Sequence, residues 1–144
     1  MLNLCARACD TIMFIAEWHK SSYFKEGIKV ALARERCVAC RRDSPRVTDM
    51  DIAELHPAVS EWRLTEEDGI KRLDRTFGVG DFAGAMAFAS RVGDSAEEEG
   101  HHPRLTVEWG RVNVAWWTHK IKGLHRNDFI MAAKTDRLYV RPNP

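Results

Sequence analysis

The chain has 144 residues and a formal net charge of +1, with 44% hydrophobic and 30% charged residues. This length fits one domain, and the apolar content excludes a chain that is disordered throughout. The near-balance of charge argues against a nucleic-acid-binding protein that works through bulk positive charge. No run approaches the roughly 18 apolar residues of a membrane span, and no signal peptide is recognisable, so we expect a cytoplasmic protein with no membrane or nucleic-acid partner.

Residues 1–47 differ in charge from the rest of the chain. They hold nine of the 22 Lys/Arg and five of the 21 Asp/Glu, a net charge of +4, against −3 for residues 48–144. Because this segment also lacks a sustained amphipathic period, we predict a weakly ordered N-terminal extension at residues 1–47 and a folded domain at residues 48–144. A further hypothesis is that translation starts near Val30, in which case residues 1–29 are absent from the native protein.

All four cysteines, Cys5, Cys9, Cys37 and Cys40, lie in the first 40 residues. A secreted disulfide scaffold would have cysteines throughout its core, so this distribution argues against one. Two pairs of cysteines could supply the four ligands of a zinc site. The pairs lie far apart, however, and the first spacing is loose, so we favour ordinary reduced thiols.

The first clear elements of the folded domain are a short helix and a hairpin. Thr48 can cap a helix that Pro57 ends. Apolar and polar residues alternate around residues 62–64 and again over residues 73–77. The turn signal at residues 66–69 separates these two runs, so we predict two antiparallel strands joined as a hairpin.

A long helix is predicted next, from its cap at Asp81 to a stop at Gly100. Apolar residues recur in it at spacings of three and four, which is typical of a helix with one buried face. The predicted buried stripe is Phe82, Ala85, Met86, Ala89, Val92 and Ala96. Because the stripe is rich in alanine, this helix can lie close to a sheet.

A second hairpin and a last helix complete the chain. Residues 105–109 and 112–116 alternate apolar and polar, with a turn at Gly110–Arg111. A helix then starts at Asn127 or Asp128. The order predicts an α+β fold, in which a four-stranded antiparallel sheet has helices packed on one face and the β-β-α-β-β-α core is preceded by a short helix. The uncovered face and edges of the sheet favour a homo-oligomer, either a dimer or a tetramer.

Three histidines are predicted to meet at one corner of this sheet. His101 and His102 precede the third strand, and His119 follows the fourth. In an antiparallel hairpin the start of one strand lies beside the end of the other, so the hairpin alone brings these imidazoles together. With the predicted turn, Pro103 lies roughly opposite Thr118.

Three imidazoles near Glu97 permit two chemistries. Imidazole titrates near neutral pH and can give or take a proton. Three histidines, or two with a glutamate, can also bind zinc, but adjacent histidines chelate one ion poorly, so we favour acid–base catalysis without a metal. The acidic run at Glu97–Glu99 opposes the helix macrodipole, and such broken local rules mark candidate functional sites. The histidines expected to be ordinary surface or loop residues are His19, His56 and His125.

The spaced residues of this region resemble a family signature. The pattern is Glu97-x3-His101-His102-Pro103-x5-Trp109-x9-His119-x8-Asp128. It is similar to that of bacterial pterin-4a-carbinolamine dehydratases, also called 4a-hydroxytetrahydrobiopterin dehydratases, and the resemblance covers about residues 37 to 140. Animal members carry acidic residues where Gly100 and Lys120 stand, so contacts through those two side chains do not carry over.

The resemblance implies both a fold and a reaction. The implied fold is the α+β arrangement given above. The implied activity is a lyase that dehydrates 4a-hydroxytetrahydropterin to quinonoid dihydropterin and so recycles the pterin cofactor of aromatic amino acid hydroxylases. The resemblance implies no metal and no organic cofactor, and it implies a functional link to phenylalanine hydroxylase. The alternative is a non-catalytic binding or dimerisation module that pairs with a transcription regulator or a hydroxylase.

The resemblance also assigns roles to individual residues. It places catalysis on His101, His102 and His119, with one of the first two as the acid at the hydroxyl and His119 as base or orienter. The implied substrate-binding residues are Glu97, Gly100, Pro103, Trp117, Thr118 and Lys120. Asp128, at the start of the last helix, is expected to have a structural role near the site and to fix this corner through backbone bonds.

Overall fold

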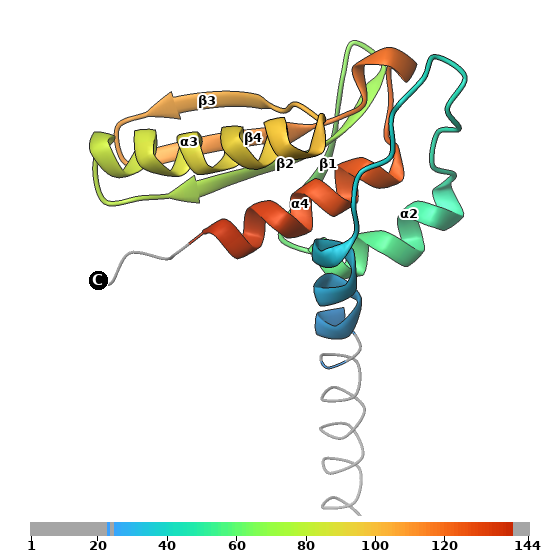
Figure 1. Ribbon diagram of the computed structural model, residues 1–144, viewed down its shortest axis with the longest axis horizontal. Helices are drawn as coiled ribbons and strands as arrows, with labels where there is room; N and C mark the ends of the chain where they lie inside the picture. The colour runs from blue at the N-terminus through green and yellow to red at the C-terminus, as the bar shows by residue number, and fades with distance from the viewer. Residues whose placement is uncertain (1–22, 24, 140–144) are drawn as a thin grey trace, which may run out of the picture.

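The computed structural model describes residues 23 and 25–139 of the chain (Figure 1). The expectations for Cys5, Cys9 and His19 lie outside these residues. The same is true of most of the segment addressed by the hypothesis of a start near Val30. Among the residues described, no helix is both long and apolar enough to cross a lipid bilayer.

The first helix of the folded domain, α2 (Asp49–Leu55), begins where the sequence predicts. The Thr48 hydroxyl accepts the N–H of Asp51, and the Asp51 carboxylate accepts the N–H of Thr48. This reciprocal capping satisfies two backbone donors that the helix itself leaves unpaired. Pro57 lies in the short 3-10 helix η1 (His56–Val59) that follows directly.

The predicted four-stranded antiparallel sheet is confirmed, with the strand order β1-β2-β4-β3. Both predicted hairpins are present, and β2 pairs with β4 to join them. The first hairpin turns at Asp68 and Gly69, which both have positive φ angles. The strands are β1 (Arg63–Glu67), β2 (Ile70–Gly78), β3 (Arg104–Glu108) and β4 (Arg111–Trp116).

The register of the second hairpin corrects one prediction. The chain turns at Trp109–Gly110, one residue earlier than expected. Because a hairpin reverses direction, a shift of one residue in the turn moves every partner by two. The observed pairing, continued beyond the strands, therefore places Pro103 beside Trp116 rather than Thr118. It places His101 beside Thr118, so both ends of the hairpin still meet at the corner that carries the histidines.

Two long helices, α3 (Phe82–Glu99) and α4 (Arg126–Leu138), cover one face of the sheet (Figure 1). The predicted ends of α3 are confirmed. Asp81 accepts the N–H of Gly84, and Gly100 ends the helix in the left-handed conformation. The predicted start of α4 at Asn127 or Asp128 is slightly late, because His125 is its N-cap.

The buried face of α3 differs in part from the predicted stripe. Phe82 and Met86 are 51% and 52% exposed, whereas Phe88 is buried. Phe88 packs against the ring of Phe77 on β2, with ring centroids 4.9 Å apart. The three-and-four spacing fits either set of residues, and the position of the sheet selects the face that contains Phe88. The stripe residues that are buried as predicted are Ala85, Ala89, Val92 and Ala96.

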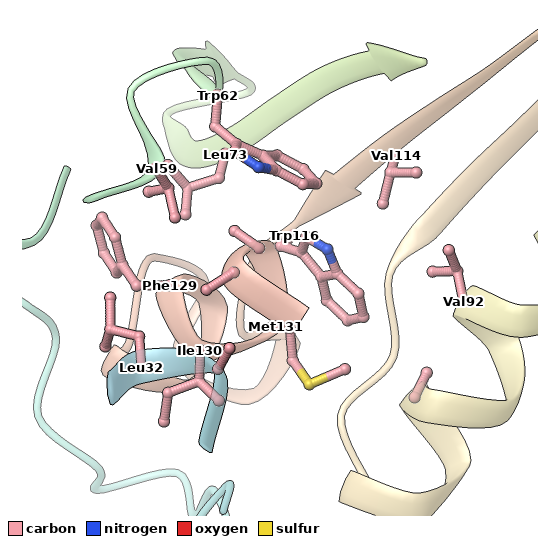
Figure 2. Packing of buried hydrophobic residues seen from close by; sticks show 14 of the residues in the cluster. Leu32, Val59, Trp62, Leu73, Val92, Val114, Trp116, Phe129, Ile130 and Met131 are labelled. Atoms are coloured by element: carbon pink, nitrogen blue, oxygen red, sulfur yellow. The ribbon is translucent and has the colours of Figure 1, made fainter. Parts of the chain in front are cut away.

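The core lies between the sheet and these helices (Figure 2). It is built on fully buried aromatic residues from the segment just before β1, from β2 and β4, and from α3 and α4. Small residues of α3 allow that helix to approach closely. The largest of these side chains are Trp62, Phe77, Phe88, Trp116 and Phe129.

The segment before residue 48 also contributes to this core. Residues 25–34 are helical, and Leu32 is only 1% exposed. Leu32 belongs to the same cluster as Phe129 and Ile130 of α4, as Figure 2 shows. The part of the extension that the structure describes is therefore attached to the domain. The domain boundary at residue 47 stays a prediction.

Replacing Leu32 by alanine tests this attachment. If the helix of residues 25–34 is part of one cooperative unit, L32A should lower the free energy of unfolding by about 3 kcal/mol. Urea unfolding followed by far-UV circular dichroism measures the change. Tyr23→Ala is the matched control, since Tyr23 is 79% exposed. An unchanged midpoint for L32A would show that the helix folds independently of the core.

Candidate functional site

One pocket of about 260 Å³ lies where α3 ends and where β4 runs into the short 3-10 helix η2 (His119–Ile121). The structure brings the three predicted histidines together in it. Histidines that are 18 residues apart in the chain thus border one cavity, as the hairpin argument predicts. The residues that line it are Ala39, Cys40, Gly100, His101, His102, Thr118, His119 and Lys120.

His101 is the most firmly held of the three imidazoles. It is 6% exposed, and its Nε2 lies 2.6 Å from Oδ1 of Asp128, which is fully buried. Its ring stacks on Trp116 with an angle of 12° between the planes. A carboxylate on one ring nitrogen fixes the orientation and tautomer of an imidazole. Nδ1 has no hydrogen-bond partner among the described residues and remains available to a ligand.

The carboxylate of Asp128, in the first turn of α4, has three hydrogen-bond partners. Besides His101, its carboxylate accepts the hydroxyl of Thr118 at 3.0 Å and the backbone N–H of His125 at 2.7 Å. Asp128 is the third residue of the helix, so the bond to His125 completes a capping box. The carboxylate therefore ties the end of β4, the start of α4 and the His101 ring to one point.

His102 lies at the exposed side of the pocket. Its Nε2 is 2.8 Å from Oε1 of Glu97, and both side chains are mostly exposed. Exposed pairs of this kind contribute little to stability. Glu97 lies in the last turn of α3 and therefore contacts the pocket only through His102.

The ring of His119 lies against Trp117, with centroids 4.4 Å apart. Trp117 also contacts Arg72 on β2, whose guanidinium carbon lies 4.2 Å from the centroid of the Trp117 ring. Arg72 is itself buried and paired with Glu67. His119 is exposed but rests on a fixed aromatic surface, so its position depends on the sheet although it lies beyond the last strand.

The predicted substrate-binding residues divide into two groups. Gly100, Thr118 and Lys120 line the pocket together with the histidines. The residues that do not line it are Glu97, Pro103 and Trp117. Of these, Glu97 and Trp117 contact a pocket histidine, as described above.

Two pocket residues, Ala39 and Cys40, were not among the predicted site residues. The Cys37-x-x-Cys40 motif was visible in the sequence, but it was assigned to the extension. Both of its thiols are free. Burial, followed by the charge of Glu99, raises the pKa of the Cys37 thiol to about 12. Burial also raises the pKa of Cys40. Thiols in such surroundings stay protonated at neutral pH and are poor nucleophiles.

Glu99 explains the acidic end of α3 that the sequence analysis singled out. Its carboxylate accepts the N–H of Cys37 at 2.8 Å and the ammonium of Lys134 at 2.9 Å. Burial raises the pKa of Glu99, but the bond from Cys37 and the charge of Lys134 outweigh it and hold the pKa below its usual value. Of the three carboxylates in the run Glu97–Glu99, that of Glu99 therefore has a structural role.

His125, which was expected in a loop, is a buried N-cap. Its Nδ1 accepts the N–H of Asn127 at 3.2 Å. Burial is the largest cause that lowers the pKa of His125 below 6.5, and His101 adds to it, while Asp128 opposes it. The folded protein therefore favours neutral His125.

This gives a prediction for the pH dependence of stability. The unfolded chain takes up a proton near pH 6.5 and folded His125 only at lower pH, so His125 stabilises the fold above pH 6.5. That contribution should be lost as the pH falls below 6.5. His125→Asn keeps a capping side chain and removes the titration. Urea unfolding at pH 7.5 and pH 5.5 should show a smaller loss of stability for H125N than for the unchanged protein. Equal losses would contradict this.

The comparisons with known proteins agree with one another. The family model described as pterin 4 alpha carbinolamine dehydratase matches residues 45–138. A protein of Gloeobacter violaceus is 59% identical over 107 residues, which cover 74% of this chain and 92% of that protein. A protein of Nitrosococcus oceani is 55% identical over 107 residues, covering 74% and 95%. Both carry the name pterin-4-alpha-carbinolamine dehydratase provisionally.

A solved structure is also similar. It is described as a transcriptional coactivator/pterin dehydratase from Brucella melitensis, with a TM-score of 0.60 and 30% sequence identity. The match covers 65% of this chain and 98% of that one. Its fold agrees with the α+β arrangement described above.

Proposed function

Since the chain belongs to the pterin 4 alpha carbinolamine dehydratase family, we propose that it is a lyase that dehydrates a 4a-hydroxytetrahydropterin by histidine acid–base catalysis. The product is the quinonoid dihydropterin. The observation that carries the proposal is the single pocket lined by His101, His102 and His119. The proposed role in metabolism is to recycle the pterin cofactor of an aromatic amino acid hydroxylase such as phenylalanine hydroxylase.

The reaction needs two proton transfers. The bond between C4a and its hydroxyl oxygen breaks, and a protonated imidazole gives that oxygen the proton with which it leaves as water. The proton on N5 passes to a neutral imidazole as the double bond between C4a and N5 forms. One proton is given and one is taken, so the pair of imidazoles returns to its starting state after exchange with solvent. Groups with a pKa near the working pH suit both transfers.

The surroundings of the histidines support a division of labour. His101 has a buried carboxylate on Nε2, which orients the ring and offsets the charge that the imidazole carries during proton transfer. His119 has no such carboxylate partner among the described residues and rests on Trp117. We assign the acid at the hydroxyl to one of His101 and His102, and the role of base or orienter to His119. The remaining imidazole can hold the ring or serve the opposite stereoisomer.

The test is the decay of a synthetic 4a-hydroxytetrahydropterin, followed by its change in ultraviolet absorbance. The purified protein should accelerate this decay, and dialysis against a chelator should leave the rate unchanged. A folded protein that does not accelerate the decay would overturn the proposal. Stoichiometric zinc in the purified protein, with activity lost on its removal, would favour the metal-dependent alternative.

A binding module is the second candidate function, because the similar structure from Brucella melitensis carries the description transcriptional coactivator. Pairing with a regulator or hydroxylase would use the surface of the fold, and it would survive loss of His119. Dehydration would not. His119→Ala therefore separates the two functions, if the variant is tested for both activity and partner binding. A homo-oligomer, dimer or tetramer, and a cytoplasmic location remain part of this proposal.

A further inference from the structure

One wall of the histidine pocket comes from a segment that precedes the part of the chain matched by the family model. The model begins at residue 45, whereas Ala39 and Cys40 line the pocket together with the histidines. The wall segment, residues 37–40, has no regular secondary structure. Its position must therefore come from contacts with other elements.

Asn127 supplies the closest of these contacts. It is 1% exposed, and its side-chain amide pairs with both backbone groups of Val38. Nδ2 donates to the Val38 carbonyl at 2.7 Å, and Oδ1 accepts the Val38 N–H at 3.2 Å. Nδ2 also lies 3.2 Å from Sγ of Cys40. The amide thus pairs with both backbone groups of Val38 as a neighbouring strand would. The Val38 carbonyl also accepts the thiol of Cys40 at 3.8 Å.

The two ends of the wall segment are held separately. At one end the N–H of Cys37 donates to Glu99 at the end of α3. At the other end the ammonium of Lys120 donates to the carbonyl of Cys40 at 3.0 Å. The wall segment is therefore bonded to α3, α4 and η2. The chain leaves α3 just before His101, α4 carries the Asp128 that bonds His101, and η2 carries His119.

We propose that Ala39 and Cys40, the two residues of the wall segment that line the pocket, are part of the pterin site. In this proposal Cys40 contacts the bound pterin, and Asn127 is the positioning residue that holds the wall segment in place. This inference rests on the proposed function, because it takes a reduced pterin as the ligand. A pterin is a flat bicycle with a polar edge, and such ligands are held by small or apolar surfaces beside a few oriented polar groups. A protonated thiol is a small apolar surface with a weak donor.

Alkylation of the thiol tests the contact directly. The full-length protein is treated with N-ethylmaleimide at mildly alkaline pH, and each labelled cysteine is read by peptide mass spectrometry. A stable pterin such as 7,8-dihydropterin, at ten times its Kd, should slow the labelling of Cys40 about tenfold. Cys37, which does not line the pocket, is the internal control. It is labelled slowly because burial raises its pKa, and the pterin should leave that slow rate unchanged.

Loss of activity on alkylation gives a second readout. A maleimide on Cys40 would fill the pocket, so labelling should abolish the dehydration of the carbinolamine. Cys40→Ser should be insensitive to the reagent, whereas Cys37→Ser should be inactivated as the unchanged protein is. Inactivation of C40S at the ordinary rate would contradict the proposed position of Cys40.

Asn127→Ala tests the positioning role. Its matched control is Val38→Ala, because the Val38 side chain is 62% exposed and the variant keeps both backbone bonds to Asn127. N127A should raise KM about tenfold with little change in kcat, since it loosens binding and leaves the histidines in place. It should also lose the protection of Cys40 by dihydropterin. If N127A does not fold, the alkylation experiments on the unchanged protein and on C40S still test whether Cys40 contacts the pterin.

The outcomes separate this inference from the proposed reaction. Protection of Cys40 without accelerated decay of the carbinolamine would support the wall and overturn the reaction. Accelerated decay with no protection of Cys40, or with equal KM values for N127A and V38A, would overturn the inference and leave the reaction intact.

Discussion

His101→Ala and His119→Ala are each expected to lower the rate of carbinolamine dehydration by about two orders of magnitude or more. Each variant removes an imidazole to which the proposed mechanism gives a proton-transfer or orienting role, and solvent water replaces it poorly. The measurement is kcat for a synthetic 4a-hydroxytetrahydropterin. Thr106→Ala, at an exposed position of strand β3, is the control for an alanine outside the pocket.

The double variant makes this test sharper. If His101 and His119 act in one proton-transfer cycle, H101A/H119A should be much less than additive in its effect on the rate. Both single variants and the double variant should keep the far-UV circular dichroism of the unchanged protein. A folded double variant that dehydrates the substrate at the ordinary rate would remove the proposed mechanism.

Replacement of Asp128 is expected to have the largest effect on stability. Asp128→Ala leaves three donors, from His101, Thr118 and His125, without their acceptor in a buried position. Each buried group left unpaired costs about 1–3 kcal/mol, so we expect a loss of about 3 kcal/mol or more. Urea unfolding measures it.

Asp128→Asn separates stability from activity. The amide keeps the shape and one acceptor oxygen, so most of the fold's stability should remain. It lacks the charge that orients His101 and offsets its protonation, and activity should fall about tenfold or more. Equal losses of stability in D128N and D128A, or full activity in D128N, would contradict the assigned role.

Local patterns were enough to predict most of the fold. Thr48 and Asp81 were recognised as caps because their side chains bond to backbone groups within the same turn. The hairpins were recognised from alternation, and the hairpin of β3 and β4 in turn brought His101 near His119. Each of these inferences depends on residues close in sequence or on a pairing that the turn enforces.

What the sequence did not reveal depends on distant partners. Cys40 reaches the pocket through Asn127, which is 87 residues away in the chain. No local period carries that information. Phe88 replaces Met86 in the core for a similar reason, because the partners that bury it, the rings of Phe77 on β2 and Tyr139 after α4, are distant in the chain.

Asn127 and Asp128 are consecutive residues, yet their side chains bond to different sides of the histidine pocket. One holds the backbone of Val38, and the other holds His101. A single turn of helix is stiff, so a tilt of α4 would carry both sides along together and leave the gap between them nearly constant. Room to admit a ligand must therefore come from the exposed part of the rim, where His102 is held only by its solvent-exposed contact with Glu97.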